Sequence, residues 1–169
     1  AISTSRLILA GGSLDNTSGA AITNLNNNVQ NWNADFTFRG SNQLDLGNGS
    51  VTLNNGNRTV TVNANSLIVG GNISSSLTNV YGLTKAGAGN LVLTGTMGTS
   101  VGGVTVNQGS LTLTGSNSYT GVTTLAGGTL QFNNAGAIST SRLILAGGSL
   151  DNTSGAAITN GNLNVQNWN

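Results

Sequence analysis

The sequence lacks cysteine, proline, histidine and glutamate, so its only acidic residues are four aspartates. Without cysteine there is neither a disulfide framework nor a thiolate metal site. General acid–base catalysis needs groups that titrate near the working pH, or paired carboxylates, and this inventory supplies few of either. We therefore expect no enzymatic activity, no cofactor and no metal ion.

Charge is also scarce. Charged residues make up 5% of the chain and the formal net charge is +1. Nucleic-acid binding requires a set of cations that neutralise phosphates, and adsorption to anionic lipid requires a basic surface, so we expect neither. No apolar run approaches the roughly 18 residues of a membrane-spanning helix, which predicts no membrane insertion by this segment.

What the chain does contain is mostly small and polar, because glycine, asparagine, threonine and serine fill more than half of it. Such a composition also occurs in flexible linkers. Hydrophobic residues nevertheless make up 37% and alternate with polar ones, as in residues 58–62 and 104–106. A period of two is typical of β-strands, and no stretch has a helical period. The chain is predicted to be all-β.

The longest internal repeat relates residues 1–33 to residues 137–169, an offset of 136 positions. The copies differ only where Leu25 and Asn27 correspond to Gly161 and Leu163. We interpret residues 1–136 as one long tandem unit and residues 137–169 as the start of the next copy, within one continuous segment. Because the chain starts and stops inside this pattern and has no leader, we expect a piece of a longer array.

A shorter period is marked by glycines in the motif apolar-x-x-Gly-x-apolar. Their spacing fits turns of about 19–20 residues if one marker was missed near Asn31–Trp32, while the register of residues 15–48 and 53–89 stays open. Stacked turns of this kind form a right-handed parallel β-helix, or β-solenoid, here of roughly eight to nine turns over residues 1–169. The glycines expected at structural corners are Gly12, Gly49, Gly71, Gly89, Gly109, Gly128 and Gly148.

Residues 82–131 carry a more specific pattern. Residues 82–95 read Gly-Leu-Thr-Lys-Ala-Gly-Ala-Gly-Asn-Leu-Val-Leu-Thr-Gly, and residues 111–124 and 128–130 continue it. This stretch resembles the passenger-associated β-strand repeat of bacterial autotransporters and related secreted proteins. Its Leu-x-Leu-Thr-Gly element occurs twice, which we interpret as an inserted turn at about residues 96–115. The resemblance implies a right-handed β-helix exported to the cell surface or beyond, and it brings no catalytic residue with it.

The aromatic residues include two candidates for a ligand contact. Trp32 and Trp168 lie in the duplicated sequence Val-Gln-Asn-Trp-Asn. An exposed indole stacks well on a sugar, but packing in the interior or at a corner is the favoured interpretation. Tyr81 and Tyr119 belong to the pattern of the resembled family and are expected to pack.

The four aspartates were considered as metal ligands or catalytic groups. Asp15 and Asp151 occupy equivalent positions in the two copies and lack the second carboxylate that calcium usually needs, so turns or solvated side chains are expected there. Asp35 and Asp45 lie ten positions apart. A polysaccharide-cleaving site would need them clustered with a base, for which the candidates, which we do not favour, are Arg39 and Arg58.

Three further patterns have structural interpretations. Lys85, the only lysine, is expected to be exposed and to discourage sideways strand pairing. Thr-x-Thr pairs at 59–61, 94–96 and 112–114 would suit ice binding if they were aligned, but their offsets of 35 and 18 predict a broken array. Asparagines within 24–28 and 54–57 are expected to form amide ladders.

These observations predict a structural extracellular segment, a stalk, rod or filament, of a bacterial surface or secreted tandem-repeat protein. The alternative is an adhesin passenger that binds glycans or cell-surface proteins through its lateral face, and a polysaccharide-acting enzyme is a weaker third. A single turn cannot bury its own apolar side chains, so we also expect head-to-tail stacking with copies of the chain or adjoining repeats.

Overall fold

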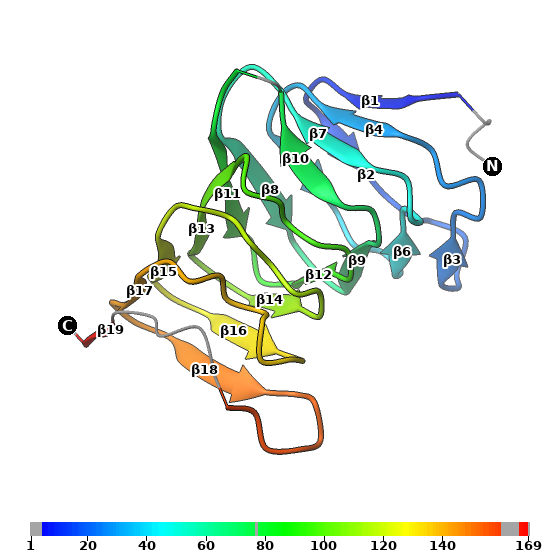
Figure 1. The fold of residues 1–169 in the computed structure, drawn as a ribbon. Coiled ribbons are helices and arrows are strands. Elements are labelled where there is room, and N and C mark those ends of the chain that lie inside the picture. The colour runs from blue at the N-terminus through cyan, green and yellow to red at the C-terminus, as the bar shows by residue number, and fades with distance from the viewer. Residues whose placement is uncertain (1–4, 77, 160–165, 169) are drawn as a thin grey trace.

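The computed structural model describes residues 5–76, 78–159 and 166–168. This part of the chain consists of short strands joined by turns, and every strand pair in it is parallel (Figure 1). A search of the same residues finds no helix of the length and hydropathy needed to cross a membrane. The strands belong to three sheets, called sheets A, B and C below.

The 19 strands are short and are distributed unequally among the sheets. Sheet A holds β1 (Leu7–Leu9), β4 (Gln30–Trp32), β7 (Val51–Leu53) and β10 (Ile73–Ser75). Sheet B holds β2 (Ser13–Leu14), β5 (Phe36–Phe38), β8 (Arg58–Val62), β11 (Tyr81–Ala86), β13 (Val101–Val106), β15 (Thr123–Leu125), β17 (Leu143–Leu145) and β19 (Gln166–Trp168). Sheet C holds β3 (Ile22–Thr23), β6 (Leu44–Asp45), β9 (Ser66–Val69), β12 (Asn90–Leu93), β14 (Ser110–Leu113), β16 (Thr129–Phe132) and β18 (Ser149–Asn152).

The chain visits the sheets in rotation, so that β1, β2 and β3 make one turn and β4 returns to sheet A beside β1. Successive turns follow one another along the axis from the blue end to the orange end of the ribbon (Figure 1). The predicted all-β parallel solenoid is therefore confirmed. The seven strands of sheet C mark about seven turns, close to the predicted eight to nine.

Alternation along each strand builds the interior. In sheet C the leucines of successive turns lie in register, and their side chains are fully buried. Burying one such side chain contributes about 1.5–3 kcal/mol, and here each packs against its counterparts in the turns before and after. The core therefore exists only between turns, and its sheet C column comprises Leu67, Leu91, Leu111 and Leu130.

The length of a turn differs between the two halves of the molecule. In sheet C, Leu91, Leu111 and Leu130 recur after 20 and 19 positions, which agrees with the prediction of 19–20. The earlier turns are longer than predicted, since Leu67 pairs with Leu91 after 24 positions and Arg58 with Leu83 after 25. The extra residues supply a strand to sheet A, whose last member is β10.

The seven glycines proposed as corners all lie between strands, but they occupy three different corners. The spacing of 37 and 22 residues between the first three glycines therefore compares unlike corners, which is why it did not match the later spacing. Gly12 precedes a strand of sheet B, two glycines precede strands of sheet A, and four precede strands of sheet C; these are Gly49 and Gly71, and Gly89, Gly109, Gly128 and Gly148, respectively.

The duplicated segment lies on different sides of the coil in its two copies. Residues 7–9 form β1 of sheet A, whereas the identical residues 143–145 form β17 of sheet B. Residues 13–14 likewise lie in sheet B and residues 149–152 in sheet C. The 136-residue unit therefore spans a number of turns that is not whole, and the second copy starts one sheet further around the coil.

Candidate functional site

The outer surface of sheet B carries a rank of threonines, one in each of four successive turns. The register places Thr84 opposite Thr59 and Thr105, and Thr105 opposite Thr124. All four side chains are half-buried on the outer side of strands whose alternate residues point inward. This surface offers hydroxyl and methyl groups at a spacing of about 4.8 Å along the axis.

Sequence reasoning missed this rank because it searched for Thr-x-Thr pairs at equal spacing. The aligned threonines recur after 25, 21 and 19 positions, so the unequal turns conceal them. Of the pairs proposed, 94–96 lies outside the strands and 112–114 begins on sheet C. The usable signal was a threonine flanked by residues that point inward, as in 83–85 and 104–106.

Beside this rank the surface is hollowed. A shallow depression of about 200 Å³ is lined by Thr84, Thr105, Asn57 and three glycines. A Cβ at Gly103 would lie 2.5 Å from the carbonyl oxygen of Val122, so the close approach of the next turn excludes any side chain there. The Asn57 Oδ1 accepts a hydrogen bond of 2.8 Å from the N–H of Gly82. The depression thus exposes backbone and neutral polar groups, and none of the residues lining it is ionisable.

The acidic residues are used to join turns rather than to form a cluster. Asp15 accepts hydrogen bonds from the Ser41 N–H at 2.9 Å and the Ser41 Oγ at 2.7 Å, and these bonds lower the pKa of Asp15. Asp35 accepts from the Thr59 N–H at 2.9 Å and lies 3.6 Å from the Arg58 guanidinium. Each carboxylate reaches a residue 23 to 26 positions later, which is one turn away.

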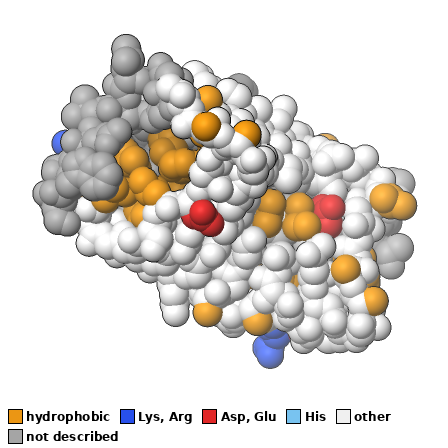
Figure 2. All heavy atoms as spheres, turned by 90° about the horizontal axis from the view of Figure 1, so that it is seen from below, with side chains coloured by type: hydrophobic (Ala, Val, Ile, Leu, Met, Phe, Trp, Pro, Cys, Tyr) orange, Lys and Arg blue, Asp and Glu red, His pale blue; other side chains and the backbone are white. Residues whose placement is uncertain are grey.

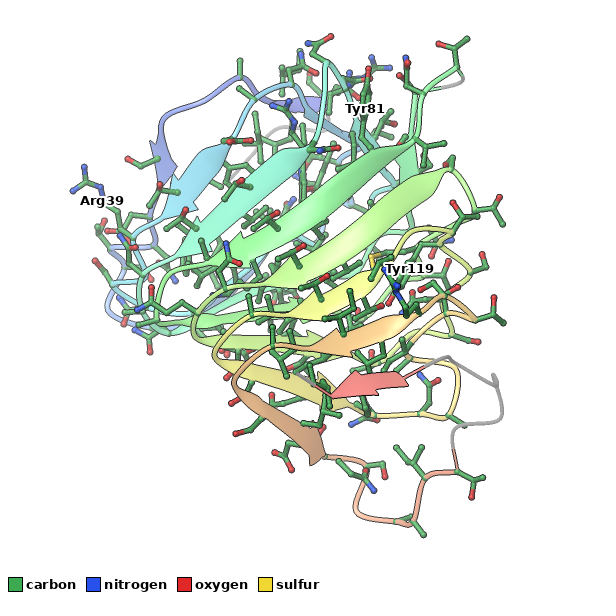
Figure 3. All side chains as sticks on the ribbon, turned by 90° about the vertical axis from the view of Figure 1, so that its left-hand side faces the viewer. Arg39, Tyr81 and Tyr119 are labelled. Atoms are coloured by element: carbon green, nitrogen blue, oxygen red, sulfur yellow. The ribbon has the colours of Figure 1, made fainter. Side chains whose placement is uncertain are left out.

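The remaining charged candidates do not converge either. Asp45 accepts from the Gly47 N–H at 2.8 Å, and Asp151 accepts a long contact of 3.5 Å from Gln131. Arg39 extends away from the ribbon, as Figure 3 shows, and its Nε lies 3.2 Å from the Ser13 Oγ. Over the described residues there is no group of three potential metal-ligating side chains. The face drawn in Figure 2 shows the same scarcity of charge, with isolated acidic side chains among neutral atoms.

Trp32 is an interior residue. Its side chain is fully buried, its ring meets that of Phe36 edge-on at a centroid distance of 5.1 Å, and its Nε1 donates to the Gln30 Oε1 at 3.2 Å. Without an exposed face this indole contacts no external ligand, so the structure corrects the ligand interpretation for Trp32. For Trp168 only the backbone, in β19, lies within the described part of the chain, and its side chain falls outside it.

The two tyrosines differ in exposure. Tyr119 is fully buried, and its hydroxyl lies 2.5 Å from the Thr123 Oγ1. Burial raises the pKa of Tyr119 to about 12. Tyr81 is half-buried and packs against the core. Both are labelled in Figure 3. The packing role expected for these residues agrees with their positions.

Lys85 occupies a position where the sequence-based expectation was wrong, because its side chain is fully buried instead of exposed. It stands in an interior column of sheet B between Val60 and Val106. Its ammonium donates to the carbonyl oxygens of Ala86, Gly87 and Gln108 at 2.7, 2.6 and 3.0 Å. Burial lowers the pKa of Lys85 to about 8. The cation therefore fastens one corner to the next turn and is shielded from solvent.

Asparagine side chains also connect neighbouring turns, although mostly not as ladders. One rung of the expected kind joins the Asn54 Nδ2 to the Asn33 Oδ1 at 3.0 Å. Asn24 donates to Asn28 at 2.9 Å within one corner. Other amides bond the backbone of the adjacent turn, as the Asn65 Nδ2 does with the Gly40 carbonyl at 2.6 Å. The asparagines thus serve mainly to satisfy backbone groups at corners.

Comparison with known proteins identifies the repeat. The passenger-associated-transport-repeat family model matches residues 83–112 and 108–132. This confirms the resemblance found at residues 82–131: the stretch carries two repeats of the autotransporter passenger type. Neither the curated proteins nor the solved structures gave a match to the chain.

Proposed function

We propose that this chain is a structural segment of an exported bacterial passenger region, a stalk, rod or filament at the cell surface or beyond. The passenger-type repeats at 83–132 support the extracellular setting. The observation that carries the mechanical role is the unbroken stacking of sheet C, in which seven strands follow one another in register from β3 to β18. Load along such a stack is shared by the hydrogen bonds of every turn.

The polar side chains support the same proposal, because they are engaged in holding turns together. The buried Lys85 ammonium, the Asp15 and Asp35 carboxylates and the Asn54 amide each bond a residue about one turn away. Such bonds exclude water from corners and limit access of proteases to the backbone. A segment of this kind requires no catalytic group, cofactor or metal, in line with the prediction from composition.

An adhesin passenger is the second candidate, and the depression on sheet B favours it. Its neutral polar lining, formed by Thr84, Thr105 and exposed glycine backbone, suits hydrogen bonding to a sugar hydroxyl. No charge repels or attracts a partner there, so the ligand class that fits is a neutral glycan. This second role is compatible with a stiff coil, since a solenoid presents its lateral face along its length.

A glycan array probed with the full chain separates the two functions. A purely structural segment leaves every spot unlabelled. For an adhesin, one glycan class is retained, and replacing Thr84 and Thr105 together with alanine weakens that binding at least several-fold. The matched control is Thr124→Ala, which removes a threonine of the same rank outside the depression. Binding that is unaffected by the double variant would assign the glycan to another surface.

A further inference from the structure

The first copy of the duplicated segment has an open edge. β1 and β2 are the terminal strands of sheets A and B, and each pairs with a described strand on one side only. The N–H groups of Ala10 and Thr17 have no hydrogen-bond partner among the described residues. An unpaired edge of this kind accepts a strand whose backbone groups match its own.

The second copy shows which surface matches, because residues 137–160 repeat residues 1–24 without a change. There β17 and β18 lie on β15 and β16 of the preceding turn. The Ala146 N–H donates to the Leu125 carbonyl at 2.9 Å, and the Thr153 N–H to the Phe132 carbonyl at 2.9 Å. These two amides are the counterparts of the two that lack a partner in the first copy.

A pair of equivalent glycines makes the same comparison in space. Gly12 and Gly148 have nearly equal positive φ angles of 80° and 75°. A Cβ on Gly148 would lie 2.3 Å from the carbonyl oxygen of Gly128, whereas a Cβ on Gly12 would meet nothing within 4 Å. The two corners therefore have the same backbone conformation, and the space filled by the preceding turn at the second copy is empty at the first.

The open end also exposes apolar side chains. A cavity of about 720 Å³ at this end is lined by Leu7, Leu14, Ile22 and Leu44, among others. In the second copy, the counterpart of Leu14 is Leu150, and it lies in register with Leu130. A turn equivalent to residues 123–132 would thus place a leucine against this apolar lining.

We propose that the edge formed by β1 and β2 binds the surface of β15 and β16 of a second copy of this chain. Within each chain that surface is covered by residues 143–152, so the two segments compete for one position. The covalently attached segment has the advantage of a high effective concentration. Release of residues 143–152 therefore converts the chain into one that joins head to tail.

The proposed joint has a defined geometry. Residues 7–9 belong to sheet A, but they would lie on β15, which belongs to sheet B of the second copy. Each joint therefore turns the next molecule by one sheet around the axis. Such a contact uses different surfaces on the two partners and does not close on itself, so it generates filaments rather than dimers.

The test uses the full chain and the matched glycines. Gly148→Ala sets a Cβ against the Gly128 carbonyl and should release residues 143–152, whereas Gly12→Ala leaves the chain's own packing unobstructed but blocks the same contact with a second copy. Sedimentation at several concentrations should show a large, concentration-dependent increase in mass for Gly148→Ala over the unsubstituted chain. Gly12→Ala alone should not increase it, and the double variant should return to the mass of the unsubstituted chain.

Amide hydrogen exchange at Ala146 and Ser149 reports whether the segment has been released, since both donate to the preceding turn. If these amides stay protected, Gly148→Val replaces Gly148→Ala as the stronger variant. The proposal is overturned if release leaves the mass unchanged. It is equally overturned if the increase persists in the double variant, because association would then use another surface. The glycan-array result has no bearing on either outcome.

Discussion

The two halves of the solenoid complete their turns in different ways. Up to β10 a turn has a strand in all three sheets and takes 21–25 residues. From β11 to β18 it has strands in sheets B and C only, and the matching residues recur after 19–21 positions. In place of a further strand in sheet A there is a single bridge between Ile73 and Met97, followed by irregular segments.

A buried asparagine shows how the short turns do without the third strand. The Asn117 Oδ1 accepts from the Met97 N–H at 2.7 Å, and its Nδ2 donates to the Ala137 carbonyl at 2.7 Å. One side chain thus bonds both the preceding and the following turn. A side-chain amide can replace part of a backbone ladder, and the passenger-type repeats at 83–132 lie entirely within this economical half.

The largest predicted effect concerns Gly95, which lies where the two halves meet. A Cβ there would be 2.4 Å from the carbonyl oxygen of Gly71, so Gly95→Ala forces two backbones apart. We expect a loss of about 3–5 kcal/mol in the free energy of unfolding and separate transitions for the two halves in a thermal scan. Gly98→Ala is the control, because its Cβ would have an ordinary contact at 3.9 Å. Equal effects of the two substitutions would refute the close-packed junction.

Replacing the amides tests how unequally the halves depend on them. Asn117→Leu leaves a buried N–H and a buried carbonyl without partners, which should cost about 2–4 kcal/mol in urea unfolding. Asn54→Leu removes a half-buried rung in the half that also has a sheet A strand, and should cost less than about 1 kcal/mol. The reverse order would mean that side-chain amides are not what sustains the short turns.

Lys85 gives the short-turn half a dependence on alkaline pH. Its pKa of about 8 in the folded chain lies below the ordinary value of 10.5, so the unfolded chain binds more protons between these values. Stability should therefore rise between pH 8 and pH 10, by at most about 3 kcal/mol. Rapid thermal scans detect this rise before asparagine is degraded. Lys85→Met should remove it, and a rise that persists in that variant would exclude Lys85 as its source.

The smallest effect is expected at Asp15 in the long-turn half. Because the Ser41 hydrogen bonds lower its pKa, its contribution to stability is present above pH 3.8 and is lost as the pH falls through the lowered value. Asp15→Asn should weaken the acid dependence of the melting temperature. Its counterpart Asp151 has only the long contact from Gln131, so Asp151→Asn should change that dependence less. A similar change in both variants would contradict this assignment.

The sequence predicted the fold through features that repeat locally. Alternation at Arg58–Val62 and at Val104 to Val106 placed the correct side chains inside, and glycines located corners. Turn length was only half predictable, because a glycine marks a corner without revealing which sheet follows it. The resemblance at 82–131 covers the region where this ambiguity is smallest, since its corners are all of one kind.

The errors at individual residues have a common origin in contacts between turns. Alternation from Leu83 already puts Lys85 on the inner face, but the cost of burying a cation argued against it. That cost is offset by carbonyl oxygens, including one contributed by the next turn at Gln108, which no local pattern reveals. The rank that contains Thr84 and Thr105 was hidden for the same reason, since register between turns decides which residues become neighbours.

The appearance of one sequence on two sides of the coil has a consequence for how such proteins lengthen. The corner Ala-Gly-Gly-Ser-Leu serves at 10–14 between sheets A and B and at 146–150 between sheets B and C. A corner that works in either place frees gene duplication from the need to copy whole coils. Recombination at almost any pair of similar corners then yields a foldable product, and each such event redirects the copied surface toward a new side of the cell's surroundings.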